Sequence, residues 1–344
     1  MYEAYYGLTA KPFQLNPDPN FYFGSRGHKR AFAYLEYGLY QSEGFIVITG
    51  EIGAGKTTVV RGLLEQLDPS KVVAVQLVST QLDADDMLRA VAVAFGLNVK
   101  GLDKAMLLAS LEAFLCSLAT EKKRALLVVD EAQNLAPRAV EELRMLSNFQ
   151  LGDQALLQSF LVGQPELRDM MSSPEMKQLR QRVIASYHLG PLDKSETRGY
   201  IEHRLHLVGW SDNPRFDASC FDLIHSLTGG IPRRINTLCN RLLLAGFLAE
   251  QRSFSASDVH AVAHEIHEEL GSDSALAPLA VINGAEAPES VLSSKMDAAT
   301  LQRHFAELEE RIDRLERTVT AAVDLLSRLL HPDRALKPQT PTRR

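Results

Sequence analysis

Short apolar runs alternate with stretches of helical periodicity through the first 190 residues. The runs are rich in β-branched residues and predict buried strands at 45–49, 72–78, 125–129 and 156–162, with a shorter one at 183–184. Between them, the spacing of apolar positions predicts helices at 27–41, 59–67, 83–95, 104–119 and 137–148. This alternation is typical of an α/β fold, in which a parallel sheet is sandwiched by helices. The continuous run at 72–78 suits a strand buried on both faces of that sheet.

The pattern becomes wholly helical after residue 190. Gly229 and Gly230 are typical of a helix end, and Pro232 suits the first turn of the next helix. Candidate helices lie at 193–208, 217–227, 232–250 and 255–270. We therefore expect an α/β domain over 25–190, followed by an all-helical lid over 191–270.

The two ends of the chain differ from this core. Residues 1–24 are rich in aromatics and prolines, which predicts an irregular segment that packs through its rings. At the other end, residues 271–296 have the composition of a linker, and the Pro-rich, basic tail at 332–344 is expected to be disordered.

A heptad repeat occupies residues 297–331. Apolar residues recur there at alternating steps of four and three, which predicts a coiled-coil helix. The repeat consists of Leu301, Phe305, Leu308, Ile312, Leu315, Val319, Ala322, Leu326 and Leu329. This helix is expected to self-associate or dock a partner; the alternative is an amphipathic helix folded back on the protein's own surface.

One stretch between a predicted strand and a predicted helix spells G-x-x-x-x-G-K-T. Its glycines let backbone N–H groups surround phosphates, its lysine reaches the outer phosphates, and its threonine hydroxyl binds Mg²⁺. The sequence therefore predicts a nucleoside triphosphate site made by Gly50, Glu51, Ile52, Gly53, Ala54, Gly55, Lys56, Thr57 and Thr58. The aromatic segment 1–24 would cover the nucleotide base or seal an edge of the sheet.

Two carboxylates end the predicted strand at 125–129. Asp130 and Glu131 would lie at the carboxyl end of the sheet, where α/β folds bind ligands. Asp130 is expected to hold Mg²⁺ through its water shell, and Glu131 to orient and polarise the attacking water. A strand that simply leaves the core can end the same way, so this interpretation depends on the glycine-rich loop.

Polar residues after later strands complete the candidate site. Gln164 could bond the terminal phosphate or the attacking water, although it could also cap the next turn. Arg182, and after it Arg180, flank the strand at 183–184. In ring-forming ATPases an arginine here reaches the neighbouring subunit's site and increases the rate of hydrolysis about 10³–10⁵-fold. The alternative is a solvated arginine at a helix end.

Arg233 lies at the amino end of the predicted helix at 232–250. A basic residue there opposes the helix dipole, which indicates a nearby anion such as an ATP phosphate.

Composition narrows the classes of function. The 344 residues carry a formal net charge of −6, which disfavours nucleic-acid binding by bulk electrostatics. The amino terminus lacks a signal-peptide pattern, and no apolar run approaches the ~18 residues of a membrane span, so we expect a cytoplasmic protein.

The three cysteines are expected to be reduced thiols in the core. Cys116, Cys220 and Cys239 are far apart in the sequence, and each lies in an apolar helical pattern.

The motifs, in this order, resemble the AAA+ ATPases. More narrowly, the chain resembles the general secretion pathway protein A type, and within it the secretion ATPases encoded with exosortase and exopolysaccharide loci. The strings that carry this resemblance are Tyr-Gly-Leu and Lys-Pro-Phe near the start, Asn-Pro-Asp-Pro at 16–19, Gly-Phe-Ile-Val-Ile-Thr-Gly-Glu at 44–51, Asp-Glu-Ala-Gln-Asn-Leu at 130–135 and Val-Gly-Gln-Pro-Glu-Leu at 162–167.

The resemblance covers about residues 1–270 and implies Mg²⁺-dependent ATP hydrolysis, ring assembly, and service to an inner-membrane export or polysaccharide-assembly apparatus. It implies that Gln164 is the first sensor and Arg233 the second sensor on the lid. Better-known members carry a membrane span and a cell-wall-binding domain after the ATPase. Here a linker and a heptad helix stand instead, so we expect any membrane association to come through partners.

Two alternatives belong to other classes. A DNA-associated helper ATPase of the transposition type shares the Asp-Glu-Ala-Gln string, but it predicts salt-sensitive DNA binding, which the acidic composition disfavours. A nucleotide-switched scaffold would bind ATP with little turnover and use the coiled coil as its working part.

Overall fold

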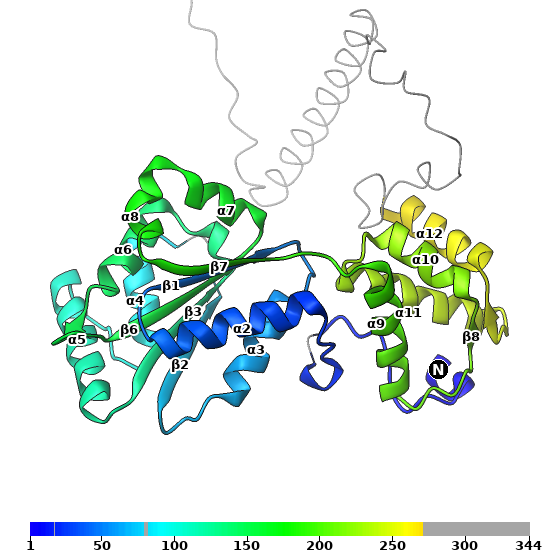
Figure 1. Cartoon of the computed structure of the whole chain (residues 1–344), viewed down its shortest axis with the longest axis horizontal. Coiled ribbons are helices and arrows are strands. Elements are labelled where there is room, and N and C mark those ends of the chain that lie inside the picture. The colour runs from blue at the N-terminus through cyan, green and yellow to red at the C-terminus, as the bar shows by residue number, and fades with distance from the viewer. Residues whose placement is uncertain (17, 79–81, 271–344) are drawn as a thin grey trace, which may run out of the picture. The chain divides into compact units, whose positions relative to one another are not determined.

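The computed structural model of the chain describes residues 1–16, 18–78 and 82–270 (Figure 1). The predicted linker at 271–296, coiled-coil helix at 297–331 and tail at 332–344 lie outside the described residues. In the described part of the chain, no helix is both long enough and apolar enough to cross a membrane.

A parallel five-stranded sheet forms the centre of the α/β part, in the order β2-β3-β6-β1-β7. Ile48 of β1 pairs with Val162 of β6 on one side and Tyr187 of β7 on the other. The carboxyl ends of β1, β3 and β6 therefore open at one edge of the sheet. The strands are β1 (Phe45–Gly50), β2 (Val72–Val78), β3 (Arg124–Asp130), β6 (Leu157–Gly163) and β7 (Val183–Leu189).

Helices cover both faces of this sheet, as the alternation of strands and helices predicts. Phe45 and Val47 of β1 belong to a core shared with α4, α5 and α6, whereas Ile46 and Ile48 belong to one shared with α2 and α3. Successive strand residues point to opposite faces, so one apolar run supplies both cores. The helices are α2 (Arg26–Gln41), α3 (Lys56–Gln66), α4 (Ala84–Ala94), α5 (Lys104–Thr120) and α6 (Pro137–Leu146).

The prediction that 72–78 is buried on both faces is wrong. β2 is an edge strand that pairs only with β3 among the described strands, and most of its side chains are half-buried. Val78 is 67% exposed. An apolar run does not distinguish a central strand from an edge strand, because both can carry the same β-branched residues.

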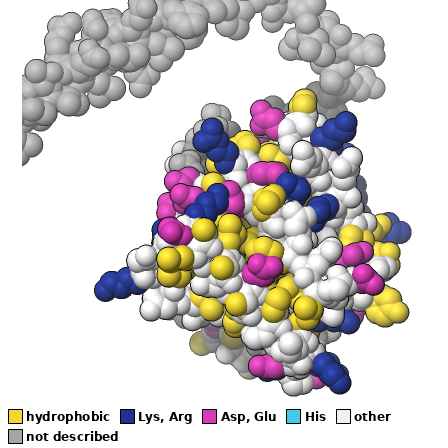
Figure 2. Space-filling view, turned by 90° about the vertical axis from the view of Figure 1, so that its left-hand side faces the viewer, with side chains coloured by type: hydrophobic (Ala, Val, Ile, Leu, Met, Phe, Trp, Pro, Cys, Tyr) yellow, Lys and Arg dark blue, Asp and Glu magenta, His cyan; other side chains and the backbone are white. Residues whose placement is uncertain are grey.

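Short elements connect the later strands. β4 (Gln150–Leu151) and β5 (Gln154–Ala155) form an antiparallel hairpin, and α7 (Pro165–Ser172), η3 (Pro174–Met176) and α8 (Lys177–Arg180) lead from β6 to β7. Apolar side chains gather on the face at the left of Figure 1, where α5 lies, and charged side chains of both signs lie among them (Figure 2).

The lid consists of α9 (Lys194–Leu207), α10 (Ala218–Thr228), α11 (Pro232–Leu248) and α12 (Ala256–Leu270). A capping box formed by Asp193 and Glu196 starts α9, and a left-handed Gly229 ends α10. The prediction of a wholly helical lid is wrong in one detail. Two short parallel strands, β8 (Arg215–Phe216) and β9 (Ser253–Phe254), pair beside the helices. Strands of two residues leave no periodicity in the sequence to detect.

Most of the described part of residues 1–24, which we call the strap, packs on the lid, whereas Tyr22 packs against the core that the sheet shares with α2 and α3. Tyr2, Tyr6 and Phe13 belong to the same apolar core as α9–α12. The Tyr2 hydroxyl donates to Asn240 Oδ1 at 2.8 Å. The strap is also less irregular than its prolines predict, because α1 (Tyr2–Tyr6) and η1 (Pro19–Phe21) are helical turns.

If the strap is part of the lid core, cutting back one of its buried rings will destabilise the protein. Phe13 is 2% exposed, so Phe13→Ala is expected to lower the free energy of unfolding by about 3–5 kcal/mol. Leu15 is 57% exposed, and Leu15→Ala should change it by less than about 0.5 kcal/mol. Urea unfolding of both variants measures this, and equal, small effects would contradict the packing.

Candidate active site

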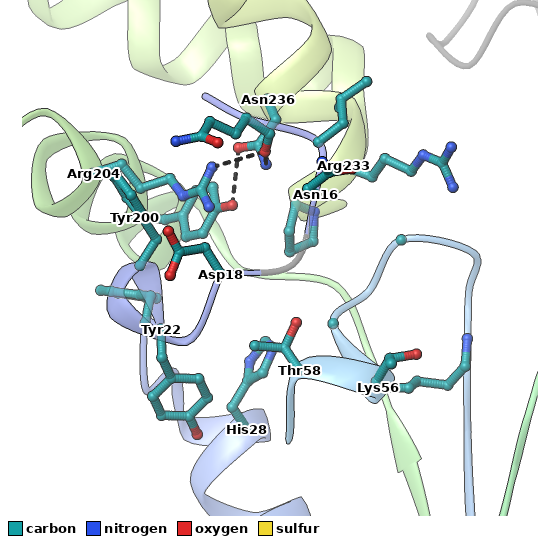
Figure 3. A pocket seen from close by; sticks show the side chains of 18 of the residues that line it. Asn16, Asp18, Tyr22, His28, Lys56, Thr58, Tyr200, Arg204, Arg233 and Asn236 are labelled. Atoms are coloured by element: carbon teal, nitrogen blue, oxygen red, sulfur yellow. Dashed lines mark hydrogen bonds between the residues drawn. The ribbon is translucent and has the colours of Figure 1, made fainter. Parts of the chain in front are cut away.

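A cavity of about 220 Å³ lies among the glycine-rich loop, the strap and the lid (Figure 3). Gly53, Gly55, Lys56 and Thr57 line one end of it. The other end is lined by strap residues including Asn16 and Asp18, and by lid residues including Tyr200, Arg204 and Asn236. The structure thus brings the sequence-predicted loop against two segments that lie far from it in the chain.

The loop passes so close to the lid and to α2 that Gly53 and Gly55 have no room for a side chain. Gly53 and Gly55 have φ angles of +82° and +100°, in the left-handed region that favours glycine. A Cβ at Gly53 would lie 2.3 Å from Arg233 Cβ, and one at Gly55 would lie 2.5 Å from His28 Nε2. The Arg233 N–H donates to the Gly53 carbonyl at 3.2 Å. The lid and α2 therefore contact the loop through its glycines.

His28 of α2 contacts the loop at Gly55, and this residue was not identified from the sequence. It is buried in the first turn of α2, where its Nδ1 lies 2.6 Å from the hydroxyl of the N-cap Ser25. Burial lowers the pKa of His28 below its usual value, which favours the neutral ring. A single histidine in an amphipathic helix carries no sequence signal for such a role.

Lys56 and Thr57 are the first two residues of α3, directly after the glycines of the loop. Lys56 Nζ donates to the carbonyls of Gly50 at 2.8 Å and Glu51 at 3.0 Å, inside the loop itself. Burial lowers the pKa of Lys56, and the nearby charges of Glu131 and Asp130 oppose this shift. The Thr57 hydroxyl donates to Asp130 Oδ2 at 3.0 Å, so the two predicted metal ligands lie together.

Asp130 and Glu131 leave the end of β3 in different directions. Asp130 is buried, and its carboxylate also accepts the Glu131 N–H at 3.0 Å and a longer bond of 3.4 Å from Gln76 Nε2. Glu131 has a φ of +53°, unusual for a residue with a side chain, and it turns the chain sharply into η2 (Ala132–Asn134). Because of this turn, the Glu131 side chain does not continue the in-and-out alternation of the side chains of β3.

The Glu131 carboxylate is held by two side-chain amides. Gln133 Nε2 donates to its Oε2 at 2.6 Å, and Gln164 Nε2 donates to the same oxygen at 3.0 Å. Burial alone raises the pKa of Glu131, but these amide bonds and the charge of Lys56 outweigh it, so the pKa lies below its usual value. Gln164 thus lies where the sequence places it, whereas Gln133 is an addition that the sequence analysis missed.

The predicted arginines occupy different places. Arg233 lines the cavity from the start of α11. Arg180 donates to the carbonyls of Met171 and Ser173, and Arg182 donates to the carbonyl and hydroxyl of Ser147. Neither Arg180 nor Arg182 lines the cavity of its own chain, so their action on a neighbouring subunit stays a prediction.

Hydrogen bonds between polar groups join the strap to the lid at the far end of the cavity. These groups were not identified from the sequence. Arg204 and Asn236 both donate to the Gln14 carbonyl, at 3.3 and 3.2 Å, and the Tyr200 hydroxyl donates to Asn236. The Arg204 guanidinium lies over the Phe21 and Tyr200 rings, and burial lowers its pKa. Such long-range pairings leave no local pattern in the sequence.

Comparison with known proteins gives matches in sequence and fold. The AAA domain family matches residues 39–171. General secretion pathway protein A of Aeromonas hydrophila is 38% identical over 267 residues, which make up 77% of this chain and 48% of that protein. The chain therefore spans about half the length of this relative.

Solved structures share the fold. The ORC2 protein of Aeropyrum pernix, solved in ADPNP and ADP complexes, superimposes with a TM-score of 0.53 and 19% identity over 70% of this chain and 66% of its own. Cdc6p of Pyrobaculum aerophilum gives a TM-score of 0.55 and 16% identity over 76% of this chain and 70% of its own. At this identity, the likeness concerns the fold alone. The family follows from the sequence matches, which identify the chain as an AAA+ ATPase of the general secretion pathway protein A type.

Proposed function

We propose that the chain binds ATP with Mg²⁺ in this cavity and hydrolyses it to ADP and phosphate. The observation that carries the proposal is the meeting of the loop, the Thr57–Asp130 pair and the Glu131 carboxylate at one edge of the sheet. These groups lie at or after the ends of β1 and β3, and hydrolysis of a phosphoanhydride needs them together.

The triphosphate would occupy the loop end of the cavity and the base the strap and lid end. Apart from the Ala54 N–H, which donates to the Glu51 carbonyl at 3.1 Å, the backbone N–H groups of the loop and of the first residues of α3 would be offered to phosphate oxygens. Lys56 Nζ would exchange the carbonyls of Gly50 and Glu51 for phosphate oxygens, which would also compensate its buried charge. Arg233 would meet the phosphates from the lid.

Thr57 and Asp130 fit a Mg²⁺ ion. A hydroxyl and a buried carboxylate, already 3.0 Å apart, are the hard oxygen ligands that Mg²⁺ prefers, directly or through water. When bound, Mg²⁺ would neutralise charge on the phosphates. Glu131 would orient the attacking water and receive its proton, while the bond between the terminal phosphorus and the bridging oxygen breaks and ADP leaves.

The proposal extends to assembly and partners. We propose a homo-oligomeric ring in which Arg182 or Arg180 reaches the neighbouring subunit's site. We further propose that the protein is cytoplasmic and peripheral at the inner membrane, where it serves an envelope secretion or exopolysaccharide export apparatus. Its similarity to general secretion pathway protein A supports this assignment, and the strings at 16–19, 44–51, 130–135 and 162–167 favour the exosortase-associated group.

Substitution of the proposed catalytic residues will separate binding from turnover. Glu131→Gln is expected to lower kcat for ATP about 10²–10⁴-fold while nucleotide still binds, because the amide keeps the shape but takes no proton. Lys56→Ala should weaken ATP binding about 10–100-fold, since it removes a charged phosphate contact. Phosphate release and equilibrium binding of a fluorescent ATP analogue measure both effects in the full chain.

Glu65→Gln is the matched control, because Glu65 is exposed on α3 and its substitution should leave both quantities unchanged. A wild-type chain that assembles and binds ATP without turnover would overturn the hydrolase proposal and favour the nucleotide-switched scaffold.

Mixing two inactive variants tests the action of Arg182 on a neighbour. Arg182→Ala keeps an intact pocket and Lys56→Ala keeps an intact arginine, so co-expressed mixed assemblies should regain turnover at sites that combine the two. Recovery should approach about a quarter of the wild-type rate for random mixing in a ring. If Arg182 acts within its own chain, the mixture will stay as inactive as its components.

The close approach of the loop to the lid gives a further prediction. Gly53→Ala places a methyl group against Arg233 and strains the left-handed backbone, at a cost of about 1–3 kcal/mol. ATP affinity should therefore fall about 10-fold or more. Gly62→Ala, in the interior of α3 with open space around it, should keep ATP affinity and raise stability by about 0.5–1 kcal/mol. Equal ATP affinities in the two variants would contradict this role of Gly53.

A further inference from the structure

The side chain of Gln133 joins the Glu131 carboxylate to the start of α7. Its Nε2 donates to Glu131 Oε2 at 2.6 Å, and its Oε1 accepts the backbone N–H of Gln164 at 3.0 Å. Gln164 is the N-cap residue of α7, and its own side chain donates to the same carboxylate oxygen at 3.0 Å. Three residues from two strand ends thus form one closed network.

This network permits only one orientation of the Gln133 amide. A carboxylate can only accept a hydrogen bond and a backbone N–H can only donate one. The NH₂ group of Gln133 must therefore face Glu131, and its carbonyl must face Gln164. Glutamate at this position would place a second carboxylate against Glu131, and an apolar residue would lose both bonds, so the amide suits both neighbours at once.

The backbone around the network leaves room for this side chain. A Cβ on Gly163 would lie 2.8 Å from Gln133 Oε1, so the absence of a side chain there admits the amide. Glu131 itself has a φ of +53°. A non-glycine residue in this conformation costs about 1–3 kcal/mol unless its surroundings hold it, and the bond from Gln133 is one of the contacts that hold it.

The two amides on Glu131 differ in what else they can do. Gln164 is placed to turn toward a terminal phosphate or the attacking water, and in doing so it would leave Glu131. Gln133 is anchored at both ends of its amide, so its bond to Glu131 can persist when Gln164 turns away. Among the described residues, no other side chain donates to this carboxylate.

We infer that Gln133 is a positioning residue for hydrolysis, which holds the Glu131 carboxylate in place for the attacking water while Gln164 contacts the nucleotide. The inference rests on the proposed ATPase function. Gln133 also links Glu131 to the backbone of Gln164, the N-cap residue of α7, so displacement of the start of α7 is transmitted to the carboxylate even when the Gln164 side chain has turned away.

The test compares Gln133→Leu with Asn134→Leu in the full chain. Asn134 is the exposed neighbour in η2, and its substitution makes the same amide-to-apolar change without touching the network. Gln133→Leu is expected to lower kcat for ATP about 10–100-fold, as misplacement of a reacting group does, with the Kd of an ATP analogue unchanged within about twofold. Asn134→Leu should leave both unchanged. Gln133→Glu, which keeps the length of the side chain, should lower kcat as well, so the result does not depend on one variant folding.

A double-mutant cycle separates positioning from a general structural role. If Gln133 acts through Glu131, adding Gln133→Leu to Glu131→Gln will lower the residual turnover no further. If the two losses multiply, Gln133 acts independently of Glu131 and the inference fails.

The remaining outcomes are distinct. Wild-type kcat in both Gln133 variants, or a loss of ATP affinity as large as the loss of kcat, would overturn the inference while leaving the proposed function intact. Absence of turnover in the assembled wild-type chain would overturn the proposed function, and this inference with it.

Discussion

The closeness of the glycine-rich loop to the groups around it is the constraint on which the site depends. Gly53 lies against Arg233 of the lid and Gly55 against His28 of α2, at separations that exclude even a methyl group. Close packing of this kind leaves two parts of a protein few relative positions. The loop therefore links the position of the lid to the shape of the phosphate site, because movement of either changes the same contacts.

The parallel sheet makes a complementary contribution. The motif residues lie at 50–57, 130–131 and 164, at the ends of three strands that are neighbours in the order β3-β6-β1. Because the strands are parallel, their carboxyl ends meet at one edge of the sheet, although the motifs are far apart in the sequence. The resulting cluster mixes a buried lysine, two carboxylates and two amides. The hydrogen bonds and charges within it keep Glu131 ionised despite its burial.

Much of this arrangement can be predicted from the sequence, because strands, helices and the phosphate loop are encoded by local spacing. The positions of Asp130 and Gln164 follow from where β3 and β6 end, and those of Lys56 and Thr57 follow from the glycine-rich loop that leads into α3. Burial of β2 could not be predicted, since edge and central strands carry similar residues. His28, Arg204 and Gln133 were missed for another reason. Their roles depend on partners up to 190 residues away or on the fine orientation of one amide, and neither produces a periodic pattern.

The packing of the strap on the lid has a consequence for how the protein forms during synthesis. Tyr2 bonds Asn240, and Tyr6 bonds the carbonyl of Gln251, so residues that are made early pair with residues that are made more than 230 positions later. The α/β part can begin to fold while the strap still has no partner, because domains generally fold as units during synthesis. Until the lid helices emerge, Tyr2, Tyr6 and Phe13 of the strap lack the core on which they pack and stay exposed to solvent and to other nascent chains. A chaperone that holds this aromatic segment would therefore protect the chain during the interval before the lid is complete.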